Sequence, residues 1–334
     1  MRALLVGLGS IGRRHLSNLR QIDPDVQITV WHQHTRSDVV PGAERVVYNL
    51  EEALAERPDV ALITGPAVTH IETGLALAHE GVHLFIEKPL SHDLQRVDTL
   101  IEDCHQRNLV MMVGYNLRFC EPLRIMQQAA SDGRIGRIVG LRAEVGQYLP
   151  DWRKGPDYRQ GVSARRELGG GAILELSHEL DYACWLMGEV NTVSAQADRV
   201  SDLEVDVEDL AEMTLQFQSG AIGNVHVDML QRAVTRMCRL IGTDGTLIWD
   251  GISNQVRLFE AETHAWIDLH PAMSIDRNAM YVAELGHFFE CVANRTRPLI
   301  SGEDGRRVLQ IALAAKQSAS EQRVIELCSP TLLA

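Results

Sequence analysis

The chain has 334 residues, of which 45% are hydrophobic, and its formal net charge is −13. This length exceeds what one hydrophobic core usually covers, so the sequence predicts a globular protein of two domains. The acidic balance argues against nucleic-acid binding, which needs clustered positive charge. No apolar run approaches membrane-spanning length, and the first residues are typical of a strand rather than a signal peptide. We therefore expect a cytoplasmic protein that does not bind membranes.

Cysteine and lysine usage narrows the chemistry further. The six cysteines are scattered without paired spacing, which predicts neither a metal site nor a disulfide framework. Nearly all positive charge is arginine, and the only lysines are Lys88, Lys154 and Lys316. Because lysine is so rare in this chain, a lysine near a predicted ligand site merits attention as a candidate functional residue.

A glycine-rich turn near the N-terminus carries the first functional pattern. An apolar segment of strand type leads into Gly7, Gly9 and Gly12, and a helical stretch follows through Leu19. A strand before G-x-G-x-x-G and a helix after it are the context that a dinucleotide fingerprint requires, with the pyrophosphate at the helix N-terminus. The cofactor-binding residues predicted in this turn are Gly7, Gly9, Ser10, Ile11 and Gly12.

The residues after the second expected strand, 26–31, bear on the choice of cofactor. Sites that prefer NAD usually carry Asp or Glu here to bind the ribose 2′-hydroxyl. This chain has no acid between residue 32 and Asp38, whereas Thr35 and Arg36 suit a 2′-phosphate. The sequence therefore favours NADP over NAD, with use of both as the alternative.

Strands and helices continue to alternate up to residue 113, which predicts a parallel, doubly wound sheet. Ligands bind such sheets at the carboxyl ends of the strands. A protonated Lys88 at that edge would donate to a substrate oxygen and polarise it. His70 lies in the first turn of a helix there, and a capping or core role is its alternative. The edge residues predicted to contact cofactor are Pro66, His70, Glu87 and Lys88, and those predicted to contact substrate are Tyr115, Asn116 and Arg118.

A run of three glycines, residues 169–171, leads into an apolar segment that contains Glu175 and His178. Residues three apart share one face of a helix, so we expect a carboxylate and an imidazole side by side. Such a pair suits proton transfer. The alternative is a surface helix with an incidental polar pair.

The second half reads differently. A helix is expected over 123–131, and helices over 279–294 and 305–320 close the chain. Strands are expected over 138–148, 190–200, 210–218, 221–229, 236–242 and 247–249. Hairpin-like turns join several of them, which predicts a mostly antiparallel sheet.

Residues 148–166 combine five positive side chains with three aromatic ones in an acidic protein. Arginine binds phosphate or carboxylate bidentately, and aromatic faces suit sugar rings or bases. The alternative is a solvated loop that docks on a neighbouring subunit or on acidic residues of its own chain. The substrate-binding residues predicted in this loop are Tyr148, Trp152, Arg153, Tyr158 and Arg165.

Four motifs in this order resemble the Gfo/Idh/MocA family, the relatives of glucose–fructose oxidoreductase and inositol dehydrogenase. They are Gly7-x-Gly9-x-x-Gly12, Glu87-Lys88-Pro89, Gly114-Tyr115-Asn116, and the glycine run with His178-x-x-Asp181. The resemblance covers most of the chain. It implies an α/β protein, with an N-terminal Rossmann domain over 1–120 and a C-terminal α+β domain over 121–334. The second domain would have a large, open-faced sheet through which a homodimer or homotetramer assembles.

By this resemblance Lys88 and His178 form the catalytic set, with His178 as the acid/base. The family usually places Asp four residues before the histidine, where this chain has Leu174, and Glu175 three residues before is the nearest acid. We expect an NAD(P)-dependent oxidoreductase that moves a hydride between nicotinamide and a ring carbon of a sugar, a cyclitol or a phosphorylated or nucleotide-linked sugar. The alternatives are an NAD-assisted glycosidase or epimerase with transient oxidation, and a non-catalytic NADP-binding regulator.

Overall fold

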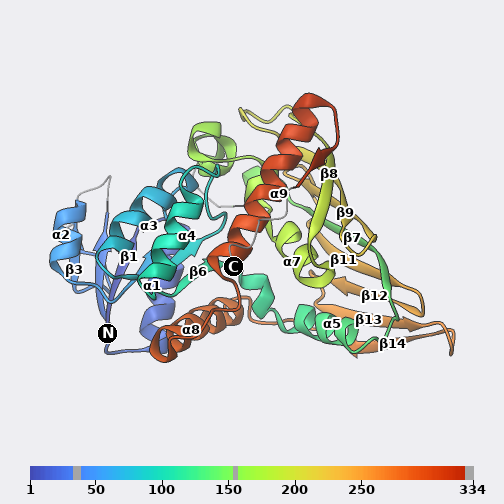
Figure 1. Ribbon diagram of the computed structural model, residues 1–334, viewed down its shortest axis with the longest axis horizontal. Coiled ribbons are helices and arrows are strands. Elements are labelled where there is room, and N and C mark those ends of the chain that lie inside the picture. The colour runs from blue at the N-terminus through green and yellow to red at the C-terminus, as the bar shows by residue number, and fades with distance from the viewer. Residues whose placement is uncertain (33–38, 153–156, 328–334) are drawn as a thin grey trace. The chain divides into compact units, whose positions relative to one another are not determined.

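The computed structural model describes residues 1–32, 39–152 and 157–327 (Figure 1). The chain divides into two compact units, Met1–Asn116 with Arg277–Leu309, and Leu117–Asp276 with Gln310–Ala334. The first division lies close to the predicted boundary at residue 120. The compact units differ from the predicted domains in residues 277–309, which complete the first unit. Among the described residues, no helix is both long and apolar enough to cross a bilayer.

The first unit is built on six parallel strands in the order β3-β2-β1-β4-β5-β6. Their bounds are β1 Arg2–Val6, β2 Gln27–Trp31, β3 Arg45–Val47, β4 Val60–Ile63, β5 His83–Glu87 and β6 Met111–Gly114. Every residue of β4, β5 and β6 is buried, as expected for a parallel sheet that is covered on both faces. The strand order reverses between β1 and β4, which is where doubly wound sheets bind ligands. The predicted Rossmann sheet is confirmed.

Helices cover this sheet, and one of them comes from the far end of the chain. They are α1 Ser10–Ile22, α2 Leu50–Ala55, α3 His70–His79, α4 Val97–Gln106 and α8 Ala279–Asn294. The ring of Phe288 on α8 packs edge-on against Phe85 of β5, with ring centres 5.8 Å apart. Asn18 and Asn278 exchange two side-chain hydrogen bonds of 2.8 and 3.3 Å. These contacts explain why residues 277–309 belong to the Rossmann unit.

The second unit contains a nine-stranded sheet in the order β14-β13-β12-β11-β7-β10-β9-β8-β15. The strands are β7 Ile138–Gly146, β8 Val190–Asp198, β9 Leu210–Phe217, β10 Ile222–Asp228, β11 Thr235–Gly242, β12 Gly245–Asp250, β13 Gln255–Glu260, β14 Ala265–His270 and β15 Ile325–Glu326. β7 and β10 run parallel, and the other neighbours are antiparallel. The predicted mostly antiparallel sheet is confirmed, although the sequence analysis missed β13, β14 and β15.

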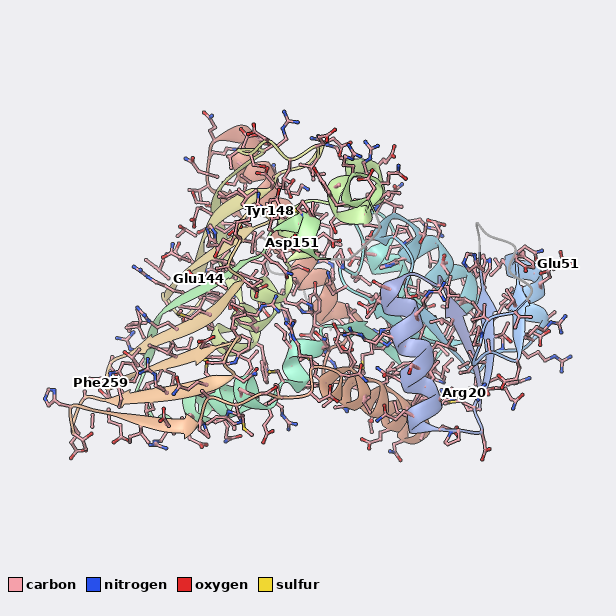
Figure 2. The ribbon with its side chains drawn as sticks, turned by 180° about the vertical axis from the view of Figure 1, so that it is seen from behind. Arg20, Glu51, Glu144, Tyr148, Asp151 and Phe259 are labelled. Carbon is pink, nitrogen blue, oxygen red and sulfur yellow. The ribbon has the colours of Figure 1, made fainter. Side chains whose placement is uncertain are left out.

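One face of this sheet carries the helices of the unit, α5 Glu121–Ser131, α6 Ala172–Glu175, α7 His178–Met187 and the final part of α9 Gly302–Glu321 (Figure 1). Side chains alternate strictly along β9, where Ala211, Met213, Leu215 and Phe217 are buried and the residues between them are exposed. Figure 2 labels Glu144 of β7 and Phe259 of β13, which lie at partly exposed positions next to buried residues of their strands. The sheet is therefore open-faced, as predicted.

Candidate active site

The turn between β1 and α1 is held in a tight, glycine-dependent shape. The Gly7 amide donates to the carbonyl of Trp31 at 3.1 Å, and the Thr64 hydroxyl at the end of β4 donates to the carbonyl of Gly7 at 2.9 Å. A side chain on Gly12 would collide with the Gly7 carbonyl and approach the Thr64 hydroxyl to 2.8 Å. Glycine is therefore required where the turn meets the helix.

The same turn fits the pyrophosphate of a dinucleotide. Gly9 and Ser10 are exposed, and a carbon added to Gly9 would meet no atom within 4 Å. α1 begins at Ser10 without a side-chain cap and without an acid in its first turn. The first amides of a helix point outward and favour an anion. Gly9, Ser10, Ile11 and Gly12 would hold the diphosphate there.

Further predicted residues lie at the same edge of the sheet. Gly9, Pro66 and Lys88 follow β1, β4 and β5, which are neighbours in the sheet, and all three are at least partly exposed. Thr35 and Arg36, predicted to select the cofactor, lie outside the described residues. The chain thus brings the fingerprint, Pro66 and the predicted catalytic lysine to one edge.

Glu87 supports the lysine from inside the sheet. Its side chain is buried, one carboxylate oxygen lies 2.6 Å from Nε2 of His15 on α1, and the other accepts the Lys88 backbone amide at 3.1 Å. The structure thus shows Glu87 in a supporting position, and the cofactor contact predicted for it stays a prediction. The sequence analysis missed His15, whose signal is a histidine on the buried face of α1 beside Gly12, Leu16 and Leu19.

The His70 ring contacts two backbone carbonyl groups. Its side chain is buried, with Nδ1 3.1 Å from the carbonyl of Pro89 and Nε2 2.9 Å from the carbonyl of Gly65. Burial lowers the pKa of His70 below its ordinary value, although the carbonyls of Gly65 and Pro89 oppose this shift. A neutral imidazole has one N–H, so one contact is a hydrogen bond and the other a close approach. The alternative considered for His70, a core residue, describes it better than a cofactor contact.

Tyr115 and Asn116 follow β6 but are buried, and Tyr115 has no exposed surface. The Asn116 side chain hydrogen-bonds to Tyr281 of α8, and burial raises the pKa of that phenol, followed by the nearby charge of Glu87. The substrate contacts predicted for these two residues stay predictions. Both residues shape the interior of the first unit behind the edge.

His178 lies in the second unit, half-buried, as the first residue of α7. The predicted continuous helix is interrupted, because α6 ends at Glu175 and α7 begins at His178. Glu175 and His178 therefore do not share a helical face. The apolar periodicity of the segment continues across Leu176, so it hides this break.

Two ion pairs hold α7 in place. The guanidinium of Arg118 contacts both carboxylate oxygens of Asp181 at 2.8 to 3.1 Å, and the two side chains are 6% and 0% exposed. Arg236 of β11 donates to the fully buried Glu179 at 2.8 Å. The structure thus pairs Arg118 with Asp181, and the substrate contact predicted for Arg118 stays a prediction. Both acids follow His178 within the first turn of α7, so the pairs fix the start of its helix.

Glu175 has a different partner from the one expected. Its carboxylate accepts the buried Ser163 hydroxyl at 2.8 Å. The glycine run just before it is required by close packing, since Gly171 has a φ of +113° and a side chain there would collide with the carboxylate of Glu208. Lys316 of α9 pairs with that carboxylate at 3.1 Å. The entry to α6 is therefore tightly fixed.

Most described side chains of the loop over 148–166 contact other groups of the chain, and Arg165 is exposed. Arg159 pairs with Asp157 and with Glu204, which is the predicted alternative of docking on acids of its own chain. Tyr148 stacks under Arg232, whose guanidinium carbon lies 3.4 Å from the ring centre. Trp152 donates to the carbonyl of Gln147, the Tyr158 hydroxyl accepts the Glu204 amide, and Arg165 is exposed. Arg153 lies outside the described residues.

Within the described ranges, no group of three or more His, Cys, Asp or Glu side chains is arranged to hold a metal ion. The first unit has a sheet edge that fits a dinucleotide and carries Lys88. The second unit has a helix, α7, that is held by ion pairs and begins with His178. The Rossmann sheet with its glycine fingerprint defines a dinucleotide-binding protein.

Comparison with known proteins agrees. A family model described as "Oxidoreductase family, NAD-binding Rossmann fold" matches residues 1–115, and the "GFO/IDH/MocA C-terminal domain" matches residues 123–248. The chain is 30% identical to a myo-inositol 2-dehydrogenase of Thermotoga maritima over 98% of both chains. It is 26% identical to an NAD⁺-dependent scyllo-inositol 2-dehydrogenase of Bacillus subtilis over 95% of this chain and 94% of that one. The protein belongs to the Gfo/Idh/MocA family of oxidoreductases.

A solved structure of levoglucosan dehydrogenase with NADH and levoglucosan is similar in fold, with a TM-score of 0.88 over 98% of this chain and 99% of that one, at 20% identity. This likeness is independent support for the two folds described above.

Proposed function

We propose that this chain oxidises a secondary hydroxyl on a ring carbon of a cyclitol or sugar. The observation that carries this proposal is the full-length similarity to myo-inositol 2-dehydrogenase, in a chain that has a lysine after β5 and a histidine at the start of α7. Bound nicotinamide supplies the hydride acceptor. Lys88 and His178 provide the hydrogen-bond donor and the proton acceptor that the reaction also needs.

The two side chains have distinct roles. His178 accepts the proton of the substrate hydroxyl as general base. Lys88, as a cation, donates a hydrogen bond to the same oxygen and stabilises the charge that develops on it. Glu175 orients or tunes one of them, and Ser163 fixes its carboxylate.

Substitution of these residues tests the roles. Lys88→Met and His178→Asn should each lower turnover of myo-inositol by about 10²- to 10⁴-fold, because each removes a positioned proton-transfer or charge-stabilising group. Fluorescence titration should show that both variants still bind NAD(P)H. His264→Asn is the matched control, since His264 is exposed with a φ of 51°, a conformation that asparagine tolerates. Normal turnover of the active-site variants on a substrate that the wild type oxidises would refute the roles.

We also propose that residues of the 148–166 loop contact the substrate, namely Tyr148, Trp152, Arg153, Tyr158 and Arg165. The exposed Arg165 supports an anionic group on that substrate, such as a phosphate or a nucleotide. Arg165→Gln should raise KM for a phosphorylated sugar or cyclitol and leave KM for the neutral compound unchanged. Equal effects on both compounds would remove the anionic group from the proposal.

For the cofactor, we propose a preference for NADP over NAD. The absence of an acid between residues 32 and 37 supports it, together with Thr35 and Arg36. Titration with NADPH and NADH, repeated with Arg36→Ala, tests the preference. Tighter binding of NADPH that the substitution abolishes is the expected result. Preference for NADH, the cofactor in the solved levoglucosan dehydrogenase, would overturn it.

A second candidate function keeps the site and changes the net reaction. A relative that is 24% identical over 83% of both chains is named 2,7-anhydro-N-acetylneuraminate hydratase rather than a dehydrogenase. This favours, as the alternative, transient oxidation of one sugar carbon that is later reversed, as in an NAD-assisted glycosidase or epimerase. Reduced cofactor that accumulates in proportion to product would exclude it.

We further propose a cytoplasmic homo-oligomer, a dimer or tetramer assembled through the open face of the nine-stranded sheet. Ile222, Ile241 and Trp266 support this assembly, since they are 54%, 37% and 46% exposed on strands of that sheet. Analytical ultracentrifugation of the wild type and of Trp266→Glu measures it, with dissociation of the variant as the expected result.

A further inference from the structure

The His15–Glu87 contact is unusual for its burial. The imidazole is completely buried and the carboxylate nearly so, at 0% and 9% exposure of their side chains, and their nitrogen and oxygen are 2.6 Å apart. The two residues are 72 positions apart in the chain, on α1 and at the end of β5. A buried carboxylate is tolerated only where donors satisfy it. His15 and the Lys88 amide are such donors.

The contact also constrains the imidazole. A carboxylate oxygen accepts, so Nε2 of His15 carries a hydrogen, whereas Nδ1 is buried and has no hydrogen-bond partner among the described residues. An imidazolium would bury an unsatisfied N–H donor at Nδ1, which native proteins rarely do. The neutral Nε2–H tautomer leaves only an unfilled lone pair. The geometry therefore favours the Nε2–H tautomer, in which His15 orients Glu87.

Glu87 in turn fixes the lysine loop from one side. Its second oxygen accepts the Lys88 amide at 3.1 Å, while the carbonyl of the next residue, Pro89, contacts His70. The backbone on both sides of Lys88 is thus tied to a buried side chain. Only His15 belongs to the helix whose N-terminus fits the dinucleotide.

We propose that His15 is a positioning residue, which holds Glu87 and thereby links the dinucleotide-binding helix to the catalytic lysine loop. This inference rests on the proposed function of Lys88. His15 itself touches neither substrate nor cofactor. It sets the direction from which the Lys88 side chain leaves the edge of the sheet.

Two amide substitutions differ in reach by one methylene group. In His15→Gln the side-chain nitrogen reaches the place of Nε2 and can still donate to Glu87, whereas in His15→Asn it stops near the place of Nδ1. We expect His15→Asn to lower kcat by about 10²-fold, as for a catalytic group misplaced by about 1 Å. The kcat of His15→Gln should be at least about tenfold higher than that of His15→Asn. The loss should fall on kcat, with the dissociation constant for NADH little changed.

His83→Asn is the matched control. His83 is likewise buried and begins the same strand that Glu87 ends, and its Nδ1 accepts the Val110 amide at 2.8 Å, which the asparagine oxygen can replace. This control should keep the wild-type kcat. An equal loss of kcat in His83→Asn would show that any damage to β5 suffices, and would overturn the inference.

The scarcity of lysine gives a readout that does not depend on turnover. Protein grown with lysine labelled with ¹³C at Cε should show three side-chain signals, for Lys88, Lys154 and Lys316, assigned by Lys→Arg variants. In His15→Asn we expect the Lys88 signal to move by more than its line width, or to broaden, while the other two coincide with wild type. In His15→Gln the Lys88 signal should return towards its wild-type position. An unchanged Lys88 signal in folded His15→Asn would refute the positioning role.

Failure of this inference is distinguishable from failure of the proposed function. If Lys88→Met keeps normal turnover, the catalytic role of the lysine is wrong. If Lys88→Met is inactive while folded His15→Asn has wild-type kcat and an unchanged Lys88 signal, only the positioning role of His15 is wrong. Thermal unfolding followed by circular dichroism establishes that each variant is folded.

Discussion

The two units hold the side chains proposed as catalytic by different physical means. In the first unit, the Lys88 loop is tied by hydrogen bonds from a backbone amide and by contacts of two buried histidines. In the second, the helix that begins with His178 is tied by ion pairs whose carboxylates are fully buried, at Asp181 and Glu179. Removal of one partner from a buried ion pair strands a charge, whereas loss of a hydrogen bond costs less. We therefore expect substitution of these partners to lower the free energy of unfolding more in the second unit than in the first.

The largest expected effect comes from the Arg118–Asp181 pair. Arg118→Met should lower the free energy of unfolding by about 3–5 kcal/mol, because it leaves the Asp181 carboxylate buried without its cation. Urea denaturation followed by tryptophan fluorescence measures this, since four of the five tryptophans, residues 152, 185, 249 and 266, lie in the second unit. The double variant Arg118→Met/Asp181→Leu should recover most of the loss. A single variant as stable as wild type would remove the contrast between the units.

The corresponding change in the first unit should cost less. His70→Leu removes the ring that contacts the carbonyls of Gly65 and Pro89, and should lower stability by about 1–3 kcal/mol. Denaturation followed by circular dichroism measures it. His79→Leu, at an exposed ion pair with Asp103, is the control and should have little effect. A loss larger than that of Arg118→Met would reverse the comparison.

A smaller effect is expected at the single hydrogen bond to Glu175. Ser163→Ala should lower stability by about 1 kcal/mol, because it removes one donor from a half-buried carboxylate that water can partly replace. Ser163→Thr keeps the hydroxyl and serves as its partner variant. Unfolding midpoints in urea compare the two. Equal midpoints for the alanine and threonine variants would show that the bond contributes nothing.

The pH dependence of stability should differ in sign between the units. Burial, and then the charge of Arg295, lowers the pKa of His83 to about 4 from 6.5, so its contribution is present above pH 6.5 and is lost as the pH falls towards 4. The hydrogen bond to Asp228 raises the pKa of His226 to about 9, despite partial burial and with help from Glu212. Its contribution is present below pH 6.5 and is lost as the pH rises through 9.

Stability curves from pH 4 to pH 9 check this pair of signs. His83→Asn should flatten the acid side of the curve, and His226→Gln should flatten the alkaline side. Because His226 is 24% exposed, solvent screening should make its effect the smallest of those described. The comparison fails if either variant flattens the opposite side.

How much of this could be predicted depends on the range of each interaction. The parallel sheet and its ligand edge follow from local patterns, an apolar strand, a glycine turn and a helix, repeated along the first 113 residues. The role of Arg118 could not be predicted, because its partner Asp181 lies 63 residues away and an arginine after a strand reads equally well as a ligand-binding residue. His15 and Glu87 present the same difficulty.

The break between Glu175 and His178 was hidden for another reason. Leu176 keeps the apolar spacing of a continuous helix, so periodicity alone extends α6 into α7. The glycine run was informative in the opposite way. It marked a place of close packing, where Gly171 meets the Glu208 carboxylate, although its sequence does not reveal the partner.

The return of residues 277–309 to the Rossmann unit has a consequence for synthesis on the ribosome. All six strands of that unit have been made by Gly114, but α8, whose Phe288 packs on Phe85, is made only after the strands of the second unit up to β14. The second unit in turn awaits β15 at residues 325–326. Neither unit can finish folding during translation until nearly the whole chain has emerged. Helices α1 to α4 are made with the Rossmann strands, but the part of the sheet that α8 covers must remain uncovered for most of elongation, when nascent chains are most dependent on chaperones.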